Sequence, residues 1–331
     1  MAEGVAFWAN RPVLVTGASG LVGSNLVPAL LDAGAEVTAF VRDLDGASPL
    51  AAIVRDGGCR VVRGALEDYA AVERAFVESE ARTVFHLGAQ TLVPVAARIP
   101  LATFAANVMG TAHVLEAVRR HGAGAHVVAA SSDKAYGPAG TQPYLEDQPL
   151  LGAQPYDASK AAAETVIRSY QRVYGVATAT LRCANTYGPG DLNWSRLIPG
   201  AIRAGLRGET LDIRSDGSPM RDYVHVSDVV AAYMLVAERF ASDGLAGEAF
   251  NVGTGSPASV LDVLRAVSAA LRESGAGALE HRALGVAEHE ILFQVLNHAR
   301  ITARLGWHPS VALDEGIRRT LPWYRALLGG S

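Results

Sequence analysis

Short apolar runs alternate with segments of helical periodicity through the first 185 residues, and this alternation limits the fold more than any other feature of the sequence. The apolar runs stand at 12–16, 36–41, 60–64, 83–89, 125–132 and 176–183. Between them, Leu, Val and Ala recur at helical spacing in 20–34, 68–79, 104–122 and 157–175. Strands that are buried on both faces and joined by helices form parallel sheets with right-handed crossovers. We therefore predict an α/β fold built on a doubly wound parallel sheet.

The alternation ends near residue 185, and this predicts a second, smaller part of the molecule. Beyond that point Gly, Pro and Arg become frequent, and helical segments such as SRLIPGAIRAGL and SVLDVLRAVSAALRES are separated by loops. We expect the doubly wound domain to be formed by 1–185 with 222–250. Residues 186–221 and 251–331 are expected to form a smaller α/β lobe that closes over the carboxyl ends of the strands.

The composition excludes several classes of function. A formal net charge of −4 offers no basic surface for nucleic acid or for an anionic membrane. Cys59 and Cys183 are the only cysteines, so we expect two packing residues, no disulfide framework and no bound metal. The N-terminus lacks the pattern of a signal peptide, and no window contains the run of about 18 apolar residues needed to cross a bilayer. These features predict a cytoplasmic protein.

A glycine-rich turn follows the first predicted strand. In TGASGLVG (16–23) the glycines are Gly17, Gly20 and Gly23, and the turn opens the first predicted helix. Glycine is needed where the backbone turns tightly and approaches a pyrophosphate, which then lies at the helix N-terminus. Between a strand and a helix at the start of an alternating chain, this spacing predicts a dinucleotide site. We therefore expect 1–185 with 222–250 to be a Rossmann domain that binds NAD(P).

The end of the second strand leaves the choice of cofactor open. An acid there binds the ribose hydroxyls of NAD, whereas an arginine accommodates the 2′-phosphate of NADP. Val41 occupies the usual acid position and is followed by Arg42 and Asp43, so Arg42 favours NADP and Asp43 keeps NAD possible. We expect cofactor contacts from Gly17, Ser19, Gly20, Leu21, Val22, Gly23, Arg42, Ala65, Leu66, Leu87, Gly88 and Ala89, and from Tyr156 and Lys160.

A hydroxyl, a phenol and an ammonium form the candidate reactive set. Tyr156 and Lys160 are four residues apart in a predicted helix and therefore share one face. A nearby ammonium and a cationic nicotinamide both favour the phenolate, so Tyr156 is expected to act as a base near neutrality. Ser132, at the tip of the preceding strand, can share the proton of a substrate hydroxyl. His86 is expected to be a packed residue.

These motifs resemble the extended short-chain dehydrogenase/reductase family over about residues 11–325. The stretches LRCANTYGPGD (181–191), RDYVHVSDVVAAY (221–233) and FNVGTG (250–255) resemble its nucleotide-sugar branch of epimerases and dehydratases. The resemblance implies that Asn185 and Arg221 contact the diphosphate of a nucleotide sugar, and that Asn107 is structural or holds a water. We place Gln90 and Arg196 in the same substrate site.

The two residues after Ser132 favour one reaction of that branch. A 4-epimerase needs no further acid or base, whereas a 4,6-dehydratase must also remove the C5 proton and protonate the departing C6 hydroxyl. Ser132-Asp133-Lys134 is similar to the corresponding run of CDP-glucose 4,6-dehydratases, as are FWANRPVLVTG (7–17) and LNWSRLIP (192–199). By this resemblance Asp133 is the acid, and Lys134 is either a neutral C5 base or a charged stabiliser of the enolate. Alternatively, the two form a structural ion pair that caps the strand.

Three functions follow, in this order. The first is an NAD(P)-dependent nucleotide-sugar 4,6-dehydratase, which oxidises C4, removes water across C5/C6 and returns hydride to C6 to give a 4-keto-6-deoxy sugar. The second is a 4-epimerase, including one for a uronic acid, and the third is a non-catalytic regulator that senses NAD(P). RDYVHVSDV follows the general epimerase pattern, so GDP, UDP and dTDP sugars stay open beside CDP sugars. Helices at 101–121 and 156–174 are expected to form a four-helix homodimer interface.

Overall fold

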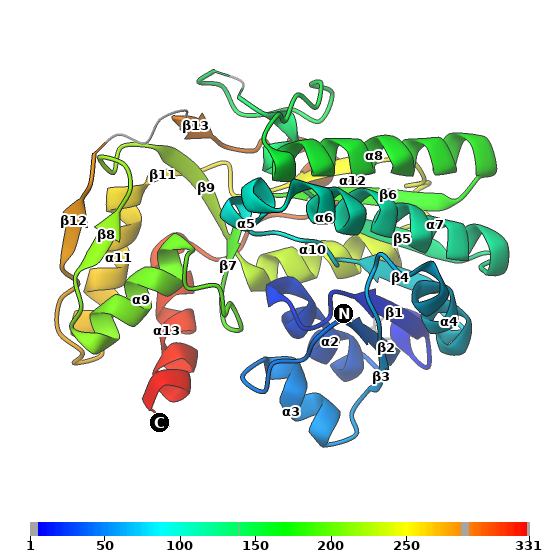
Figure 1. Cartoon of the computed structure of the whole chain (residues 1–331), viewed down its shortest axis with the longest axis horizontal. Helices are drawn as coiled ribbons and strands as arrows, with labels where there is room; N and C mark the ends of the chain where they lie inside the picture. The colour runs from blue at the N-terminus through cyan, green and yellow to red at the C-terminus, as the bar shows by residue number, and fades with distance from the viewer. Residues whose placement is uncertain (1–5, 139, 286–290, 330–331) are drawn as a thin grey trace.

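A parallel sheet of seven strands forms the larger part of the computed structural model, which describes residues 6–138, 140–285 and 291–329 (Figure 1). The strand order is β10, β6, β5, β4, β1, β2, β3. The strands are β1 (Pro12–Thr16), β2 (Glu36–Val41), β3 (Arg60–Arg63), β4 (Thr83–His86), β5 (His126–Ser132), β6 (Ala177–Cys183) and β10 (Ala249–Val252). The six strands predicted from the alternation are confirmed, and so is the doubly wound topology.

The chain reverses its direction of winding between β1 and β4, and this places a crevice at their carboxyl ends. Thr16, the last residue of β1, lies opposite Phe40 of β2 on one side and His86 of β4 on the other. Open α/β sheets bind ligands at such a switch point. On the same edge, Ser132 ends β5 opposite Cys183 of β6.

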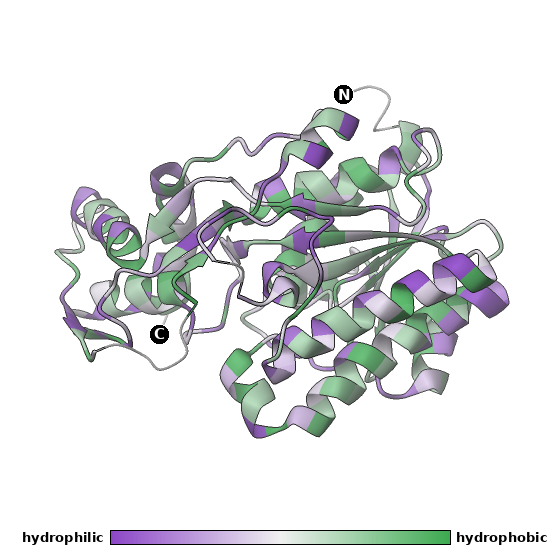
Figure 2. Cartoon of the chain, turned by 90° about the horizontal axis from the view of Figure 1, so that it is seen from above, coloured by the Kyte–Doolittle hydropathy of each residue, from purple (hydrophilic) through white to green (hydrophobic). Residues whose placement is uncertain are grey.

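Helices cover both faces of the large sheet. α2 (Leu21–Asp32), α3 (Pro49–Arg55) and α10 (Val226–Glu238) pack on one face, and α4 (Tyr69–Ser79), α7 (Gly110–His121) and α8 (Pro155–Tyr174) pack on the other. A helix that packs on a sheet with one face is hydrophobic on that face and hydrophilic on the other. In Figure 2, hydrophilic and hydrophobic residues accordingly alternate along α7 and α8. α8 begins with Pro155 in its first turn and ends at Gly175 with a left-handed φ of 69°. Both residues favour these positions, which explains why the predicted helix has these limits.

One predicted helix is divided in the structure. The segment 104–122 begins as α6 (Pro100–Phe104), continues as a π-helical turn η1 (Ala105–Met109) and ends as α7. A π-turn rotates the side chains that follow it and is often found at functional sites. α3, α5 (Val93–Arg98) and the 3₁₀ turn η2 (Asp133–Tyr136) were not predicted.

A smaller lobe with its own core lies beside the large sheet (Figure 1). Its sheets are formed by β7 (Asn185–Tyr187), β8 (Leu211–Ile213), β9 (Met220–His225), β11 (Pro257–Ser259), β12 (His281–Ala283) and β13 (Phe293–Gln294). Its main helices are α9 (Leu197–Arg207), α11 (Val260–Glu273) and α13 (Leu313–Gly329).

The packing departs from the expected domain boundary at one place. β10 extends the large sheet to Val252, and α12 (Ala299–Leu305) packs against it. Ile301, Leu305 and Trp307 therefore belong to the core of the large sheet, although the sequence places 251–331 in the lobe. The sequence of α12 shows an apolar face, but nothing in it indicates which of the two cores this face packs against.

One helical stretch meets the length and composition of a membrane span, which the sequence analysis did not foresee. Pro100–His121 has a mean hydropathy of 1.2, and half of it is buried inside the fold. It packs against α4 and α8 on the large sheet. A core helix of a globular protein gives the same signal, so we take this stretch as part of the core.

Candidate active site

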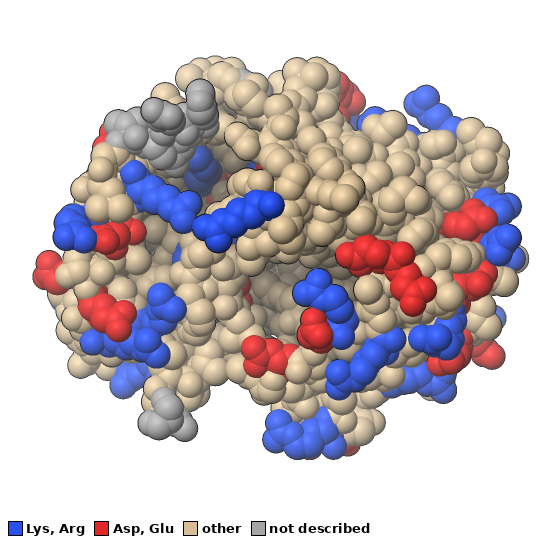
Figure 3. Space-filling view, in the orientation of Figure 1, with Lys and Arg blue, Asp and Glu red and all other residues tan. Residues whose placement is uncertain are grey.

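A cavity of about 1120 Å³ lies at the carboxyl ends of the strands and reaches into the lobe. Figure 3 shows the hollow between the two halves of the molecule, with charged side chains on its rim. Of the site residues named from the sequence, Ala65 alone is absent from the cavity lining. Its neighbours Gly64 and Leu66 line the cavity, and the cofactor contact of Ala65 stays a prediction.

The glycine turn forms the floor of one end of this cavity. Gly17 has a φ of +67°, and a Cβ atom there would lie 2.6 Å from the amide nitrogen of Gly88. A Cβ at Gly23 would overlap the carbonyl oxygen of Gly17. A Cβ at Gly20, in contrast, would approach only that oxygen, at 3.3 Å, so the turn is open on this side. Gly17 and Gly23 are needed because a side chain there would collide with the backbone. Gly20 leaves the cavity side of the turn free of a side chain.

The first turn of α2 points its amide groups into this space. The first N–H groups of a helix have no partner within the helix, and no side chain caps α2 at Gly20. A helix N-terminus with this exposure binds a phosphate or diphosphate. Glycine turn and helix together fit the pyrophosphate of a dinucleotide such as NAD or NADP.

An arginine and an acid, Arg42 and Asp43, both follow β2, where the cofactor's ribose is expected. Arg42 and Asp43 line the cavity and form an ion pair with 2.8 Å between Nε and Oδ2. Both side chains are exposed, and Ser19 donates to the backbone carbonyl of Asp43 at 3.1 Å. The arginine and the acid are therefore both within the site, and the choice between NAD and NADP stays open.

The π-turn fixes the loop that follows β4. Asn107, buried in η1, accepts from the amide of Gln90 at 2.7 Å and donates to its carbonyl oxygen at 3.0 Å. It also donates to the hydroxyl of Ser159 in α8 at 2.8 Å. Asn107 is thus a structural bridge between the Gln90 loop and the helix that carries Tyr156 and Lys160.

Ser132, Tyr156 and Lys160 lie together in the cavity, as predicted. Lys160 donates to the carbonyl oxygen of Ala130 at 2.9 Å, and burial lowers its pKa to about 8. Burial raises the pKa of Tyr156 to about 12, although a hydrogen bond with Ser132 lowers it. The expected phenolate near neutrality is therefore not produced by the chain alone, because desolvation of the phenol outweighs the opposing effects of Ser132 and Arg196 on its pKa.

Asp133 and Lys134 are brought beside this set by η2. Lys134 Nζ lies 3.1 Å from Oδ1 of Asp133 and 3.1 Å from Oδ1 of Asn185. Ser132 donates to the same Asp133 oxygen at 3.0 Å. The other oxygen of Asp133, Oδ2, is buried and has no hydrogen-bond partner among the described residues. Asp133 and Lys134 thus form an ion pair, as the structural alternative requires, and both of its members line the cavity.

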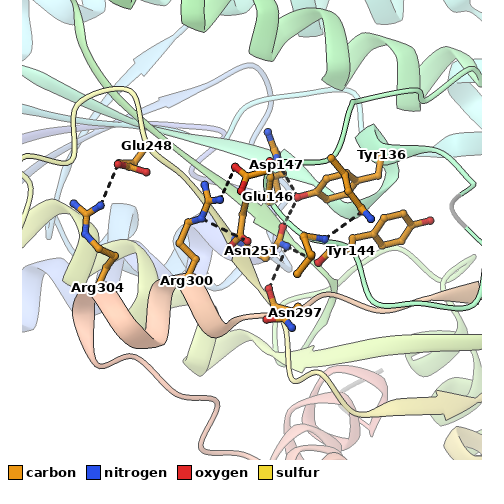
Figure 4. Close-up of polar contacts among 12 residues, drawn as sticks. Tyr136, Tyr144, Glu146, Asp147, Glu248, Asn251, Asn297, Arg300 and Arg304 are labelled. Atoms are coloured by element: carbon orange, nitrogen blue, oxygen red, sulfur yellow. Dashed lines mark hydrogen bonds and ion pairs between the residues drawn. The ribbon is translucent and has the colours of Figure 1, made fainter.

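A buried polar network holds η2 from behind. Arg182 donates to the hydroxyl of Tyr136, the last residue of η2, at 2.7 Å and forms an ion pair with Glu164 of α8. Figure 4 shows how Tyr136 continues this network to Asn251, which in turn contacts Tyr144 and Asn297. These contacts attach the turn that carries Asp133 and Lys134 to β6, α8 and the end of β10.

The lobe supplies the other wall of the cavity. Arg221 lines it from β9, and Arg196 lines it while paired with Asp191 at 3.0 Å. Side chains that the sequence analysis did not name also face the cavity: Thr186, Tyr187, Trp194, Arg214, Tyr223 and Tyr233. All but Arg214 stand inside the motifs quoted above, so the motifs signalled them; nothing in the sequence pointed to Arg214.

Two groups with possible chemistry are packing residues. His86 is buried between the hydroxyls of Thr16 and Thr111, and burial lowers its pKa to about 3. It is therefore neutral, as expected for a packed histidine. Burial raises the pKa of Cys183 to about 12, which keeps its thiol protonated and unreactive. Among the described residues, no three His, Cys, Asp or Glu side chains gather as metal ligands do.

Known proteins share the sequence pattern and the fold of this chain. The model of the NAD dependent epimerase/dehydratase family matches residues 13–253. A CDP-glucose 4,6-dehydratase of Salmonella typhimurium is 31% identical over 98% of this chain and 93% of its own length. A UDP-glucose 4-epimerase of Mycolicibacterium smegmatis is 33% identical over 94% of this chain and 98% of its own. The structure of DesIV, a dTDP-glucose 4,6-dehydratase of Streptomyces venezuelae with NAD bound, superposes with a TM-score of 0.85 at 29% identity, over 96% of this chain and 98% of its own.

Proposed function

This chain belongs to the NAD-dependent epimerase/dehydratase family, and we propose that it is a nucleotide-sugar 4,6-dehydratase. Its substrate is a hexose linked to a nucleoside diphosphate, and its product is the 4-keto-6-deoxy sugar. Relatives named as 4,6-dehydratases cover nearly the whole chain, which supports this reaction. Relatives named as 4-epimerases cover it as fully, so the choice rests on the site.

The observation that carries the choice is the pair Asp133–Lys134 in the cavity beside Ser132. A 4-epimerase only removes and returns hydride at C4, so it needs no second acid and base. A dehydratase has to move a proton at C5 and another at the C6 oxygen. Asp133 and Lys134 are two titratable side chains beside Ser132, which is proposed to contact O4, and they can fill these two roles. A pair that only capped the strand would not have to face the cavity.

The residues of the chain divide the first step between them. A bound nicotinamide would accept hydride from C4 of the sugar. Tyr156 takes the proton of the 4-hydroxyl, and Ser132, its hydrogen-bond partner, holds that hydroxyl in place. Lys160 lies one helical turn from Tyr156 and would bind the ribose of the cofactor. Tyr156 accepts this proton only as the phenolate, and the positive charge of a bound oxidised nicotinamide would favour that form against the raised pKa of the phenol.

The substrate's diphosphate needs fixed donors and cations, which the lobe supplies. We propose that Arg221 and Arg196 bind it, since a guanidinium matches phosphate oxygens in a planar fork. Gln90 is held by Asn107 at the sugar end and is proposed to contact the hexose. Asn185, expected from the resemblance to contact the diphosphate, turns its amide oxygen toward Lys134.

The cofactor is proposed to be NAD or NADP, held at the glycine turn and Arg42. Fluorescence titration of the protein with each oxidised cofactor, before and after Arg42→Ala, tests the preference. If Arg42 binds a 2′-phosphate, the substitution weakens NADP binding and leaves NAD binding nearly unchanged. Equal effects on both cofactors would contradict that role.

We also propose that the chain works in the cytoplasm as a homodimer, in which the helices at 101–121 (α6, η1 and α7) and 156–174 (α8) pack against those of a second copy. Leu101 of α6 is 83% exposed, and Met109 of η1 and Tyr174 of α8 are also exposed. Burial of such side chains against a second copy is favourable by about 25 cal/mol per Å² of apolar surface. Light scattering after gel filtration measures the mass, and Leu101→Glu is expected to give monomers.

The activity is tested by incubating the protein and its cofactor with CDP-, dTDP-, UDP- and GDP-glucose. Mass spectrometry is expected to show the loss of one water from one of them, and the product is expected to form a hydrazone as a ketone does. A product of unchanged mass with inverted C4 would instead establish the 4-epimerase. Tyr156→Phe is expected to abolish turnover; a protein that never turns over any sugar but changes partner on NAD(P) binding would be a regulator.

A further inference from the structure

The salt bridge between Asp133 and Lys134 defines which of the two can take a proton. Lys134 Nζ contacts two oxygen acceptors, Oδ1 of Asp133 and Oδ1 of Asn185, each at 3.1 Å. An ammonium in such a site has three donors and no lone pair, whereas a carboxylate has only acceptors. In this arrangement Lys134 is the donor and Asp133 the acceptor.

Asn185 reinforces this orientation. Its Nδ2 group donates to the backbone carbonyl of Asp222 at 3.3 Å, which leaves the amide oxygen facing Lys134. If the amide of Asn185 were flipped, its N–H group would face the ammonium of Lys134 and its oxygen would face the carbonyl oxygen of Asp222. Both hydrogen bonds would then be lost. The contacts with Lys134 and with β9 therefore require the same amide orientation, and this orientation favours the protonated lysine.

Asp133 retains one oxygen for chemistry. Its side chain is 1% exposed, and Oδ1 receives the hydrogen bonds from both Ser132 and Lys134. Oδ2 is buried without a partner among the described residues, although it belongs to a residue that lines the cavity. An unsatisfied buried carboxylate oxygen is costly, and its retention at a site calls for a function. A substrate C–H or O–H group that meets Oδ2 would supply the missing contact.

We propose that, in the dehydration proposed above, Asp133 is the base that removes the C5 proton and Lys134 is the acid that protonates the departing C6 oxygen. This reverses the roles implied by the resemblance and rests on the proposed function. In the 4-keto intermediate the C5–H bond breaks, and its proton passes to Oδ2 of Asp133. The electron pair forms the C5=C6 bond as the C6–O bond breaks. The oxygen takes a proton from Nζ of Lys134 and leaves as water.

The charges support this direction of proton flow. The step converts a carboxylate and an ammonium into a neutral acid and a neutral amine, so no net charge is created in a buried site. The reverse assignment has to start from the neutral pair. That start would need Lys134 to give up its proton while it is held between two oxygen acceptors, and Asp133 to gain one while it accepts two hydrogen bonds.

A change of leaving group distinguishes acid from base. Fluoride departs without being protonated, so an enzyme that lacks its general acid still eliminates it, whereas one that lacks its base does not. The probes are CDP-glucose and CDP-6-deoxy-6-fluoroglucose, with the dTDP pair as a second set. Loss of water is followed by mass spectrometry, release of fluoride by an ion-selective electrode, and C5–H exchange by deuterium uptake from D₂O.

The expected pattern separates the two residues. Lys134→Met loses turnover of the 6-hydroxyl sugar by about 100-fold or more, the usual range for removal of a general acid, but keeps fluoride release within about threefold of the unsubstituted protein. Asp133→Asn loses both reactions and C5 exchange. Lys134→Arg keeps the cation and the ion pair and cannot act as a base, so it tests the lysine without disturbing the fold. Fluoride release by this variant is expected to persist.

The opposite pattern overturns the assignment. If Lys134→Met and Lys134→Arg lose fluoride release and C5 exchange while Asp133→Asn keeps them, Lys134 is the base. If all three variants keep both reactions, neither residue is the acid or the base. Failure of the proposed function looks different, because the unsubstituted protein would then release neither water nor fluoride from any of the sugars. The reaction and the division of roles are therefore tested separately.

Discussion

The buried ion pair of Arg182 and Glu164 gives the strongest prediction for stability. Both side chains are 4% exposed, and Arg182 donates to both carboxylate oxygens of Glu164. The same guanidinium donates to Tyr136 Oη and to the carbonyl oxygen of Glu146. Glu164→Gln keeps the shape of the side chain but removes its charge and turns one acceptor into a donor. The arginine then stays buried without a counter-charge.

The cost follows from that geometry. Breaking a buried pair by removing one partner typically costs about 3–5 kcal/mol, because the remaining charge is uncompensated. The matched control is Glu116→Gln, since Glu116 also binds a guanidinium, that of Arg119, through two hydrogen bonds at 2.7 Å. Both of those side chains are partly exposed, and such pairs contribute about 0–1 kcal/mol.

Urea unfolding followed by circular dichroism and tryptophan fluorescence measures both variants against the unsubstituted protein. We expect the free energy of unfolding to fall several-fold further in Glu164→Gln than in Glu116→Gln. The double variant Glu164→Met/Arg182→Met is expected to recover much of the loss, because it removes both charges. Equal losses in the two single variants, or a double variant worse than Glu164→Gln, would refute the reasoning. Glu164→Gln is also expected to lower turnover, since it loosens the anchor of Tyr136 behind Asp133.

Two further perturbations separate stability from function. Burial lowers the pKa of Lys160 from 10.5 to about 8, so the unfolded chain binds this proton more tightly than the folded chain does. Protonated Lys160 therefore destabilises the fold by about 3 kcal/mol below pH 8. This destabilisation decreases above pH 8 and disappears at about pH 10.5. Lys160→Met is expected to be inactive yet more stable than the unsubstituted protein at pH 7, with the gain shrinking toward pH 10.5 in urea titrations; a gain that does not change with pH would contradict this. Gly20→Ala places a methyl group in the open side of the glycine turn, and we expect cofactor affinity in fluorescence titrations to fall by about tenfold or more while the urea midpoint stays near its original value. Gly124→Ala is the control, because a Cβ there meets nothing within 4 Å but the φ of +83° strains it: stability falls by about 1 kcal/mol and affinity is unchanged.

The sheet and the cofactor end of the site were predictable from the sequence because both follow from local patterns. Buried parallel strands read as apolar runs, and the spacing of Gly17, Gly20 and Gly23 reflects a turn that packs within a few ångströms of Gly88. The π-turn at Asn107 was not predictable, because its extra residue per turn depends on contacts with Gln90 and α8 that are distant in sequence.

The pair Asp133–Lys134 shows where sequence patterns stop and structure becomes necessary. Its position after Ser132 was enough to indicate a second acid and base, and hence dehydration. The direction of proton transfer depends on what surrounds each side chain, and those neighbours come from other parts of the chain: Asn185 from β7, held in turn by the backbone of β9. Asn185 stands in a motif whose resemblance implies contact with a diphosphate, yet its amide oxygen faces the lysine. The contact between this amide oxygen and Lys134 Nζ is the reason to assign the lysine as the proton donor. The same comparison applies to any chain with a lysine at a base position: its acceptors, counted in the structure, indicate whether it gives or takes the proton.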